Sequence, residues 1–239
     1  MSAPVLELSG VSKDYRGLRP LRIERLALGA GEPVAILGLD QVTAEVFVNL
    51  VTGATLPDRG EVNVFGRSTA SIADSTEWLA VVDRFGIVSQ RAVLLDALSV
   101  TQNLAMPFTL DIEPAPDEIR ARAEALAREV GLPESTWSRP LAELDAPSRT
   151  RVRLGRALAL DPAIVLLEHP TADLPSGEVI RLGHRIRAIA GARRAAIVAA
   201  TADDAFASAV ADRVLALDSA TGRLVERGGS WFRSRNRRR

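Results

Sequence analysis

The chain has 239 residues, of which 47% are hydrophobic and 25% are charged, a composition typical of a globular protein and unlike that of a disordered chain. The absence of cysteine excludes disulfides and thiolate metal sites, and no apolar run approaches the ~18 residues of a membrane span. The 30 basic and 30 acidic residues balance, but five arginines fall within the last seven positions, so the rest is mildly acidic. The N-terminus lacks a basic-then-apolar signal pattern, and we expect a cytoplasmic protein.

The N-terminal third of the chain predicts strands around a single helix. Short apolar segments bounded by turn residues are typical of strands, and a continuous apolar run such as PVAIL indicates a strand buried on both faces. The expected elements are strands at Val5–Leu8, Leu21–Leu28, Pro33–Leu37, Glu61–Phe65 and Gly86–Val88, and a helix at Ala44–Val51. The first two strands are expected to pair antiparallel.

The rest of the chain alternates helices with buried strands. The runs AIVLL and AAIVA are again apolar throughout. The expected helices are Pro116–Val130, Pro147–Leu160, Glu178–Ala190 and Asp203–Ala211, and the expected strands are Ala163–Leu167, Ala195–Ala199, Val214–Leu217 and Leu224–Glu226. This alternation predicts an α/β fold with a mostly parallel sheet covered on both faces, and the helical middle predicts an inserted subdomain.

One strand–turn–helix segment has the setting of a phosphate-binding loop. In that motif glycines leave room for phosphate, a lysine reaches the terminal phosphates, and a Ser or Thr hydroxyl holds Mg²⁺. Here the first glycine is Gly38, but the second glycine is replaced by Thr43, the lysine by Ala44 and the hydroxyl residue by Glu45. Lys13, the only lysine, lies far upstream. The segment therefore lacks the cation that nucleotide phosphates require.

The replacements also add negative charge and bulk. Asp40 and Glu45 are expected to place carboxylates where polyphosphate would lie, at a cost of several kcal/mol, or about two to four decades in affinity. Thr43 adds a Cβ where glycine is favoured. A second interpretation needs no ligand, because acidic residues at the start of a helix are favourable for its dipole.

Further motifs follow in a fixed order. Tyr15 lies in SKDYRG, Gln90 in GIVSQRAVLLDALSV, the segment LDAPS precedes RTRVRLGRALALDP, and IVLLEHPT is followed by ADL and later by ADRV. In this order and spacing the chain resembles the ATP-binding subunit of ABC transporters across nearly its whole length. The resemblance is to the lipoprotein-release, macrolide-export and cell-division branch, whose permeases are FtsX-like.

The resemblance implies a P-loop NTPase-like ABC nucleotide-binding domain. Its fold would be α/β, with a mostly parallel core sheet, an antiparallel β subdomain and an α-helical subdomain at about residues 91–160. The domain would span residues 1–229. Residues 230–239 would form a basic, disordered tail; their arginines beside two aromatic residues also fit an anionic membrane surface better than nucleic acid.

Most positions that face nucleotide in the family have changed. In the signature segment Asp145 and Pro147 stand where the family has serine and glycine, which adds an anion and removes a backbone N–H. Glu168 stands at the Mg²⁺-side aspartate, His169 at the catalytic glutamate, and Ala202 at the switch histidine. The matching positions that remain are Tyr15, Gly38 and Gln90.

The surviving and replaced residues leave alternatives. Tyr15 would stack on adenine or pack at a turn. Glu168 would hold Mg²⁺ or only end a strand. His169 would act as a replacement general base or have no catalytic role. Gln90 is expected to keep the contact with the permease that its loop makes in the family, and His184 is expected on the surface.

We therefore expect a homologue of the ATP-binding subunits that does not hydrolyse ATP. Its role would be structural or regulatory, on an FtsX-like permease complex. The expected partners are the permease and a paralogous ATPase that is competent in hydrolysis, and no nucleic acid is expected to bind. The expected location is the inner face of the cell membrane. The vestigial nucleotide positions are Tyr15, Gly38, Thr43, Ala44, Glu45, Gln90 and Glu168. No cofactor is expected, or ATP and Mg²⁺ where binding is retained. The alternatives are a stand-alone regulatory protein on this scaffold and a residual ATPase with unconventional ligands.

Overall fold

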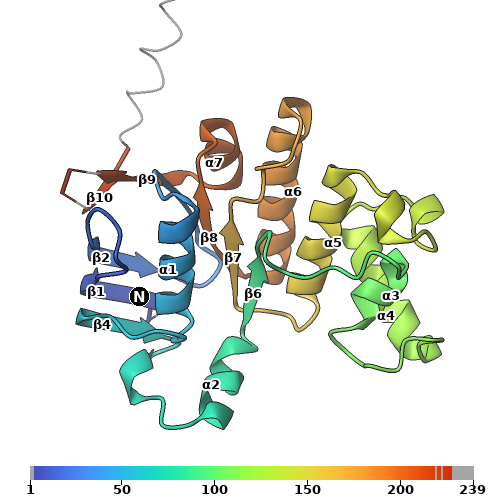
Figure 1. Cartoon of the computed structure of the whole chain (residues 1–239), viewed down its shortest axis with the longest axis horizontal. Helices are drawn as coiled ribbons and strands as arrows, with labels where there is room; N and C mark the ends of the chain where they lie inside the picture. Colours follow the sequence, from blue (N-terminus) through green and yellow to red (C-terminus); the bar gives the residue numbers. More distant parts are fainter. Residues whose placement is uncertain (1–2, 219, 222, 228–239) are drawn as a thin grey trace, which may run out of the picture.

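The computed structural model describes residues 3–218, 220–221 and 223–227. An antiparallel sheet in the order β2-β1-β4-β5 covers one side of the molecule (Figure 1). Its strands are β1 (Leu6–Lys13), β2 (Leu21–Leu28), β4 (Arg59–Val64) and β5 (Arg67–Ser68). The expected antiparallel pairing of the first two strands is confirmed.

A second sheet forms the centre of the fold, in the order β10-β9-β3-β8-β7-β6. All neighbours pair parallel except β10, which pairs antiparallel at the edge. The strands are β3 (Pro33–Leu37), β6 (Phe85–Val88), β7 (Ile164–Glu168), β8 (Ala196–Thr201), β9 (Arg213–Asp218) and β10 (Arg223–Glu226). Every residue of β7 and β8 is buried, as expected for parallel strands covered on both faces.

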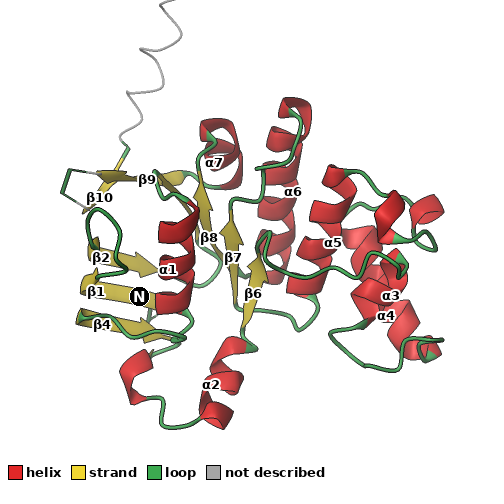
Figure 2. Ribbon diagram, viewed as in Figure 1, coloured by secondary structure: helices red, strands yellow, loops and turns green. Residues whose placement is uncertain are grey.

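Two apolar cores lie on opposite faces of this central sheet. On one face α1 (Gln41–Val51) lies between the central and the antiparallel sheet, and all three contribute to one cluster of buried side chains (Figures 1 and 2). On the other face α6 (Ser176–Arg193) and α7 (Asp204–Val210) pack together with the helical part of the chain. The expected α/β arrangement, a mostly parallel sheet covered on both faces, is thereby confirmed.

The helical part lies beyond β6 and consists of α3 (Val100–Ala105), α4 (Asp117–Glu129) and α5 (Ala146–Leu158) (Figure 1). These helices fall within residues 91–160, and the subdomain bounds expected there stay a prediction. The sequence patterns missed α3 and also α2 (Ser75–Val82). Both are too short to show the helical periodicity that distinguishes helices in a sequence.

The start of α1 differs from the expectation. The helix begins at Gln41 and not at Ala44, because the carboxylate of Asp40 accepts a hydrogen bond from the Thr43 backbone N–H and caps it. Thr43 is therefore the third residue of a regular helix, and the strain expected from its Cβ is absent. Glu45 is the fifth residue of the helix and lies outside its first turn. The interpretation that acidic residues stabilise the helix start is therefore right for Asp40 and wrong for Glu45.

The C-terminal tail and the search for membrane-spanning helices complete the description of the fold. The tail at residues 230–239 lies outside the described residues. Among the residues that are described, no helix is both long enough and apolar enough to cross a membrane.

Candidate functional site

The carboxyl ends of the parallel strands meet at one edge of the central sheet, the usual position of ligand sites in this fold class. Gly38 follows β3, Glu168 ends β7 and His169 follows it. Gln90 comes two residues after β6, and Ala202 directly after β8. The fold thus brings together most of the residues that the sequence singled out.

The loop after β3 has the glycine expected of a phosphate loop, and one N–H donor at the helix start already has a partner within the chain. Gly38 has a φ of 85°, which favours glycine. Asp40 lies where phosphate would approach, and it accepts the Thr43 backbone N–H at 2.7 Å. The hydrogen bonds from Thr43 lower the pKa of Asp40. The start of the helix, an anion-binding position in other proteins, is therefore satisfied by a carboxylate of the same chain.

Tyr15 is bonded to the phosphate loop itself. Its hydroxyl lies 2.9 Å from the hydroxyl of Thr43, which is buried, and its ring packs at the edge of the core around α1. A Cβ on Gly17 would lie 2.6 Å from the Tyr15 ring, so the turn requires glycine there. Tyr15 packs at the turn and also lines a cavity with Gly38 and Thr43; its stacking on adenine stays a prediction.

Ala44 stands at the position of the missing lysine, and this position is buried. Ala44 is fully buried in the core between α1 and the sheets. The next residue, Glu45, is directed away from the loop toward Arg91, and their side chains form an ion pair of 2.6 Å. We expected Glu45 to place a free carboxylate in the phosphate region. In the structure its charge is instead neutralised by Arg91.

Arg91 joins two replaced positions, Glu45 and Glu168, in one network. Its guanidinium pairs with Glu45 and also with Glu168, at 2.7 Å. Glu168 is completely buried at the end of β7, and its second oxygen accepts a hydrogen bond from the Gln41 amide. Buried carboxylates are stable only when they are paired and hydrogen-bonded. Arg91 supplies the cation that the site was expected to lack.

The charges of this Arg91 network support one another. The hydrogen bond to Glu168 is the main cause that raises the pKa of Arg91; the charges of Glu168 and Glu45 act in the same direction and outweigh burial. The guanidinium is therefore a permanent cation bound between two carboxylates.

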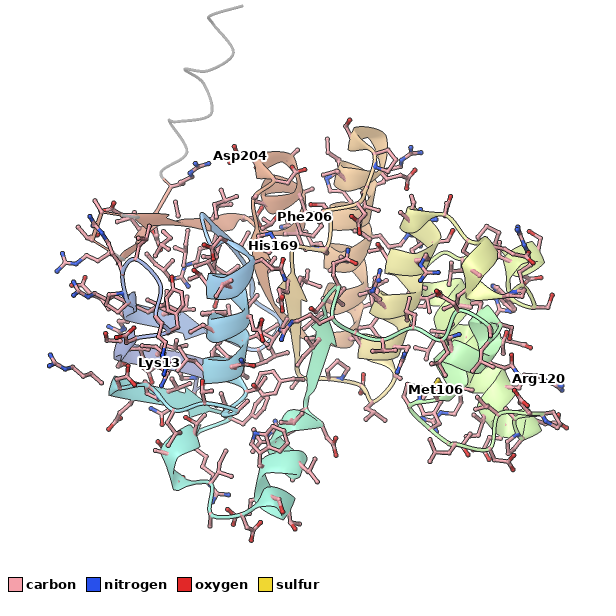
Figure 3. All side chains as sticks on the ribbon, viewed as in Figure 1. Lys13, Met106, Arg120, His169, Asp204 and Phe206 are labelled. Atoms are coloured by element: carbon pink, nitrogen blue, oxygen red, sulfur yellow. The ribbon has the colours of Figure 1, made fainter. Side chains whose placement is uncertain are left out.

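His169 and Ala202 lie together beside this network. They line a cavity of about 620 Å³ with Gln41, Thr171 and Asp203. His169, labelled in Figure 3, has a φ of 45°, and its Nε2 is buried without a hydrogen-bond partner among the described residues. The role of His169 as a replacement general base stays a prediction.

In the signature segment, as in the phosphate loop, a side-chain carboxylate of the chain accepts a backbone N–H at the helix start. Asp145 caps α5 by accepting the Ser148 backbone N–H at 2.9 Å, and its pKa is lowered mainly by the hydrogen bonds from Ser148. Pro147 is in the first turn, where a missing N–H is tolerated. The end of α5 that would face a partner's nucleotide therefore presents a carboxylate, which already accepts the backbone N–H of Ser148.

Gln90 and the residue after it have separate roles. The half-buried Gln90 side chain makes no hydrogen bond within the described part of the chain, whereas Arg91 is held in the network. Sequence reasoning missed Arg91. The available signal was an arginine directly after Gln90, together with the acidic residues Glu45 and Glu168 at two replaced positions. His184 is exposed on α6, as expected.

The residues present do not fit Mg²⁺-bound nucleotide. The described residues contain no group of three or more side chains arranged to hold a metal ion. Arg91 already neutralises the two carboxylates, and Asp40 already accepts the helix N–H. A nucleotide would have to displace these contacts without a lysine to compensate, so we derive no chemical step through it.

The sequence of the chain matches a known protein family and individual proteins. The ABC transporter family model matches residues 23–172. The chain is 31% identical over 229 residues to the lipoprotein-releasing system ATP-binding protein LolD of Chromohalobacter salexigens, covering 93% of each chain. It is 29% identical over 230 residues to the methionine import ATP-binding protein MetN of Brucella abortus, which is 96% of this chain but only 61% of that relative.

Solved structures share the fold. The protein cbiO1 of Clostridium perfringens, part of the ABC transporter complex cbiONQ, superimposes with a TM-score of 0.80 at 21% identity, over 94% of this chain and 88% of its own. The ATP-binding cassette MJ0796, in a dimeric post-hydrolysis state with ADP and Pi, gives a TM-score of 0.71 at 24% identity, over 93% and 97%.

Proposed function

The chain belongs to the ABC transporter family, and from this premise we propose that it is a non-hydrolytic homologue of the ATP-binding subunits. Its role would be structural or regulatory, on an FtsX-like permease complex. One observation carries the proposal: Arg91 binds Glu45 and the buried Glu168, the positions that would serve phosphate and metal in a competent subunit. The chain thus holds its own site together without nucleotide.

The partners follow from the family. ABC ATP-binding subunits work with membrane permeases, and LolD is named for a lipoprotein-releasing system. We propose a permease contact through the loop of Gln90, a competent paralogue that performs hydrolysis, and a location at the inner face of the cell membrane. Residues 1–229 would form the nucleotide-binding-type domain and residues 230–239 its basic tail. The positions Tyr15, Gly38, Thr43, Ala44, Glu45, Gln90 and Glu168 would be vestigial.

A turnover assay tests the absence of hydrolysis. The purified chain and its His169→Ala variant are compared at saturating Mg²⁺ and ATP, with a hydrolysing ABC subunit measured in parallel. Equal rates at the buffer background support the proposal. A rate above background that His169→Ala abolishes would refute it.

The same assay decides the second candidate, a residual ATPase. The observation that favours it is the unpartnered Nε2 of His169 in the cavity beside Gln41. Histidine has a suitable pKa for a general base near neutral pH. Loss of turnover in His169→Ala, with unchanged thermal stability, is the result that this candidate requires.

A further inference from the structure

A cavity of about 460 Å³ lies between α5 and α6, which stand next to each other in Figure 1 and are joined by the ion pair of Arg151 with Glu178. Part of its wall is apolar and includes the buried Leu182 and Ile189. Its polar part is basic and consists of Arg151, Arg181, His184 and Arg185. None of these residues belongs to the site at the strand ends.

Three guanidinium groups at this cavity share one carboxylate. Glu178 pairs with Arg151 through one oxygen and with Arg181 through the other, each at 2.9 Å. Arg185 donates a hydrogen bond of 3.3 Å to the backbone oxygen of Glu129 and forms no ion pair among the described residues. Three arginines against one glutamate leave a net charge of +2, before the exposed His184 is counted.

Two other carboxylates act near this cluster, and both already have partners. Glu129 is bound through both oxygens by Arg193, at 2.6 and 2.8 Å. Asp145, which the charge of Arg151 also reaches, accepts the Ser148 backbone N–H and caps α5. The positive charge of the cavity is therefore not balanced within the described chain.

The arginines of the cavity are held in position by protein contacts. A Cβ on Gly131 would lie 2.7 Å from the guanidinium carbon of Arg185, so this side chain packs directly on the glycine that follows α4. Its hydrogen bond to the Glu129 backbone oxygen fixes it to the C-terminal end of that helix, where a cation is favoured. Arg151 is only 24% exposed and is fixed by Glu178. Side chains fixed in advance lose less conformational freedom when a ligand binds.

We propose that this cavity binds a phosphate group, carried by a small phosphorylated molecule or by the headgroup of a phospholipid. Guanidinium groups bind phosphate through paired N–H donors. A phosphate monoester has a charge of about −1.5 to −2 near pH 7, which matches the excess charge of the cavity, whereas a single carboxylate would balance only part of it. The apolar wall strengthens the interaction, because charges attract more strongly where water is excluded.

The arrangement also limits the kind of ligand. The basic side chains gather at one cavity and do not follow a stripe along the surface, so the site fits one phosphate group and not the repeated phosphates of nucleic acid. A phosphate bound there would contact α5 of the helical part and α6 of the core together. Its binding is therefore expected to stabilise the packing of the helical part on the core.

Calorimetric titration of the full chain with inorganic phosphate tests the site. The titration is done at pH 7.5 in a chloride buffer whose ionic strength is held constant. We expect a Kd of roughly 0.1–1 mM, and a Tm that rises more with phosphate than with acetate at the same concentration. No heat of binding up to 10 mM phosphate would overturn the inference.

Variants locate the binding. Arg185→Gln is expected to raise the Kd about tenfold, and the more exposed Arg181→Gln about threefold. Arg185→Lys keeps a charge and should lose less than Arg185→Gln. The matched control is Arg187→Gln, which removes the same charge from α6 at a side chain that is paired with Asp212, and it should leave the Kd unchanged. Unchanged binding in both Gln variants at the cavity, or an equal loss in the control, would contradict the inference.

Vesicles distinguish the two sources of the phosphate. Phosphatidylcholine vesicles with phosphatidic acid, whose headgroup is a phosphate monoester, are compared with vesicles that contain the same share of phosphatidylglycerol. A preference for phosphatidic acid in co-sedimentation, lost in Arg185→Gln, assigns the site to a lipid; phosphate binding in calorimetry without this preference assigns it to a soluble molecule. The inference does not depend on the proposed function. Nucleotide is absent from every measurement, so ATP hydrolysis by the chain would refute the proposed function and leave this inference intact.

Discussion

Removal of the Arg91 side chain is the sharpest perturbation of the network that holds the site together. In Arg91→Ala the completely buried Glu168 loses its cation and keeps only the hydrogen bond from Gln41. Glu45 loses its partner as well, but its side chain is 41% exposed, so water replaces the contact at little cost. The effect of the variant therefore depends almost entirely on Glu168.

The magnitude follows from the burial of the two partners. Breaking a buried ion pair from one side costs about 3–5 kcal/mol. Arg91 is 44% exposed, so water reaches its side of the pair, and we expect a loss of about 2–3 kcal/mol in the free energy of unfolding. For a chain of this size that corresponds to a decrease of roughly 5–10 °C in Tm.

Denaturant unfolding followed by circular dichroism measures the change. The matched control is Arg120→Ala, whose ion pair with Asp117 is exposed and is expected to contribute less than about 0.5 kcal/mol. Adding Glu168→Gln to Arg91→Ala removes the buried charge and should restore most of the lost stability. An Arg91→Ala variant as stable as the control, or a double variant no more stable than the single one, would refute the role assigned to Arg91.

Three further predictions concern neighbouring contacts. Tyr15→Phe removes the hydroxyl contact with Thr43 and should cost about 1 kcal/mol in urea unfolding; no loss would show that the contact contributes nothing. Asp40→Ala should cost about 1 kcal/mol at pH 7. Because Thr43 lowers the pKa of Asp40 below its unfolded value, this stabilisation is complete above about pH 4 and disappears as the pH falls through the lower folded pKa; a pH-independent difference between the two proteins would contradict it. Gly86→Ala places a Cβ 2.3 Å from the Ala157 carbonyl oxygen, so β6 and α5 must separate, at about 1–3 kcal/mol by thermal melting; an unchanged Tm would disprove this close packing.

The core of the fold was predictable because its strands are unusual in sequence. Runs such as PVAIL and AIVLL are apolar at every position, which indicates strands buried on both faces. The short helices α2 and α3 escaped because six to eight residues give too few turns for a periodic pattern. The start of α1 escaped because the hydrogen bond of Asp40 to Thr43, and not an apolar pattern, determines it.

The candidate site was predictable in its parts but not in its chemistry. Sequence motifs located Glu45 and Glu168 as replaced positions, yet each looked like an isolated loss of function. Their connection is Arg91, which is 77 residues from Glu168 in sequence, and only the parallel sheet brings the two together. The pairing of Arg91 with Glu45 and Glu168 is therefore evident from the structure and not from the sequence.

The most direct test of the account is calorimetric titration of the purified wild-type chain with ATP, with and without Mg²⁺. The contacts of Asp40, Ala44 and Arg91 predict no heat of binding up to 1 mM ATP in either condition. Micromolar binding that requires Mg²⁺ would contradict the account, because it would show that nucleotide displaces Arg91 from Glu168 and that the site is a working one.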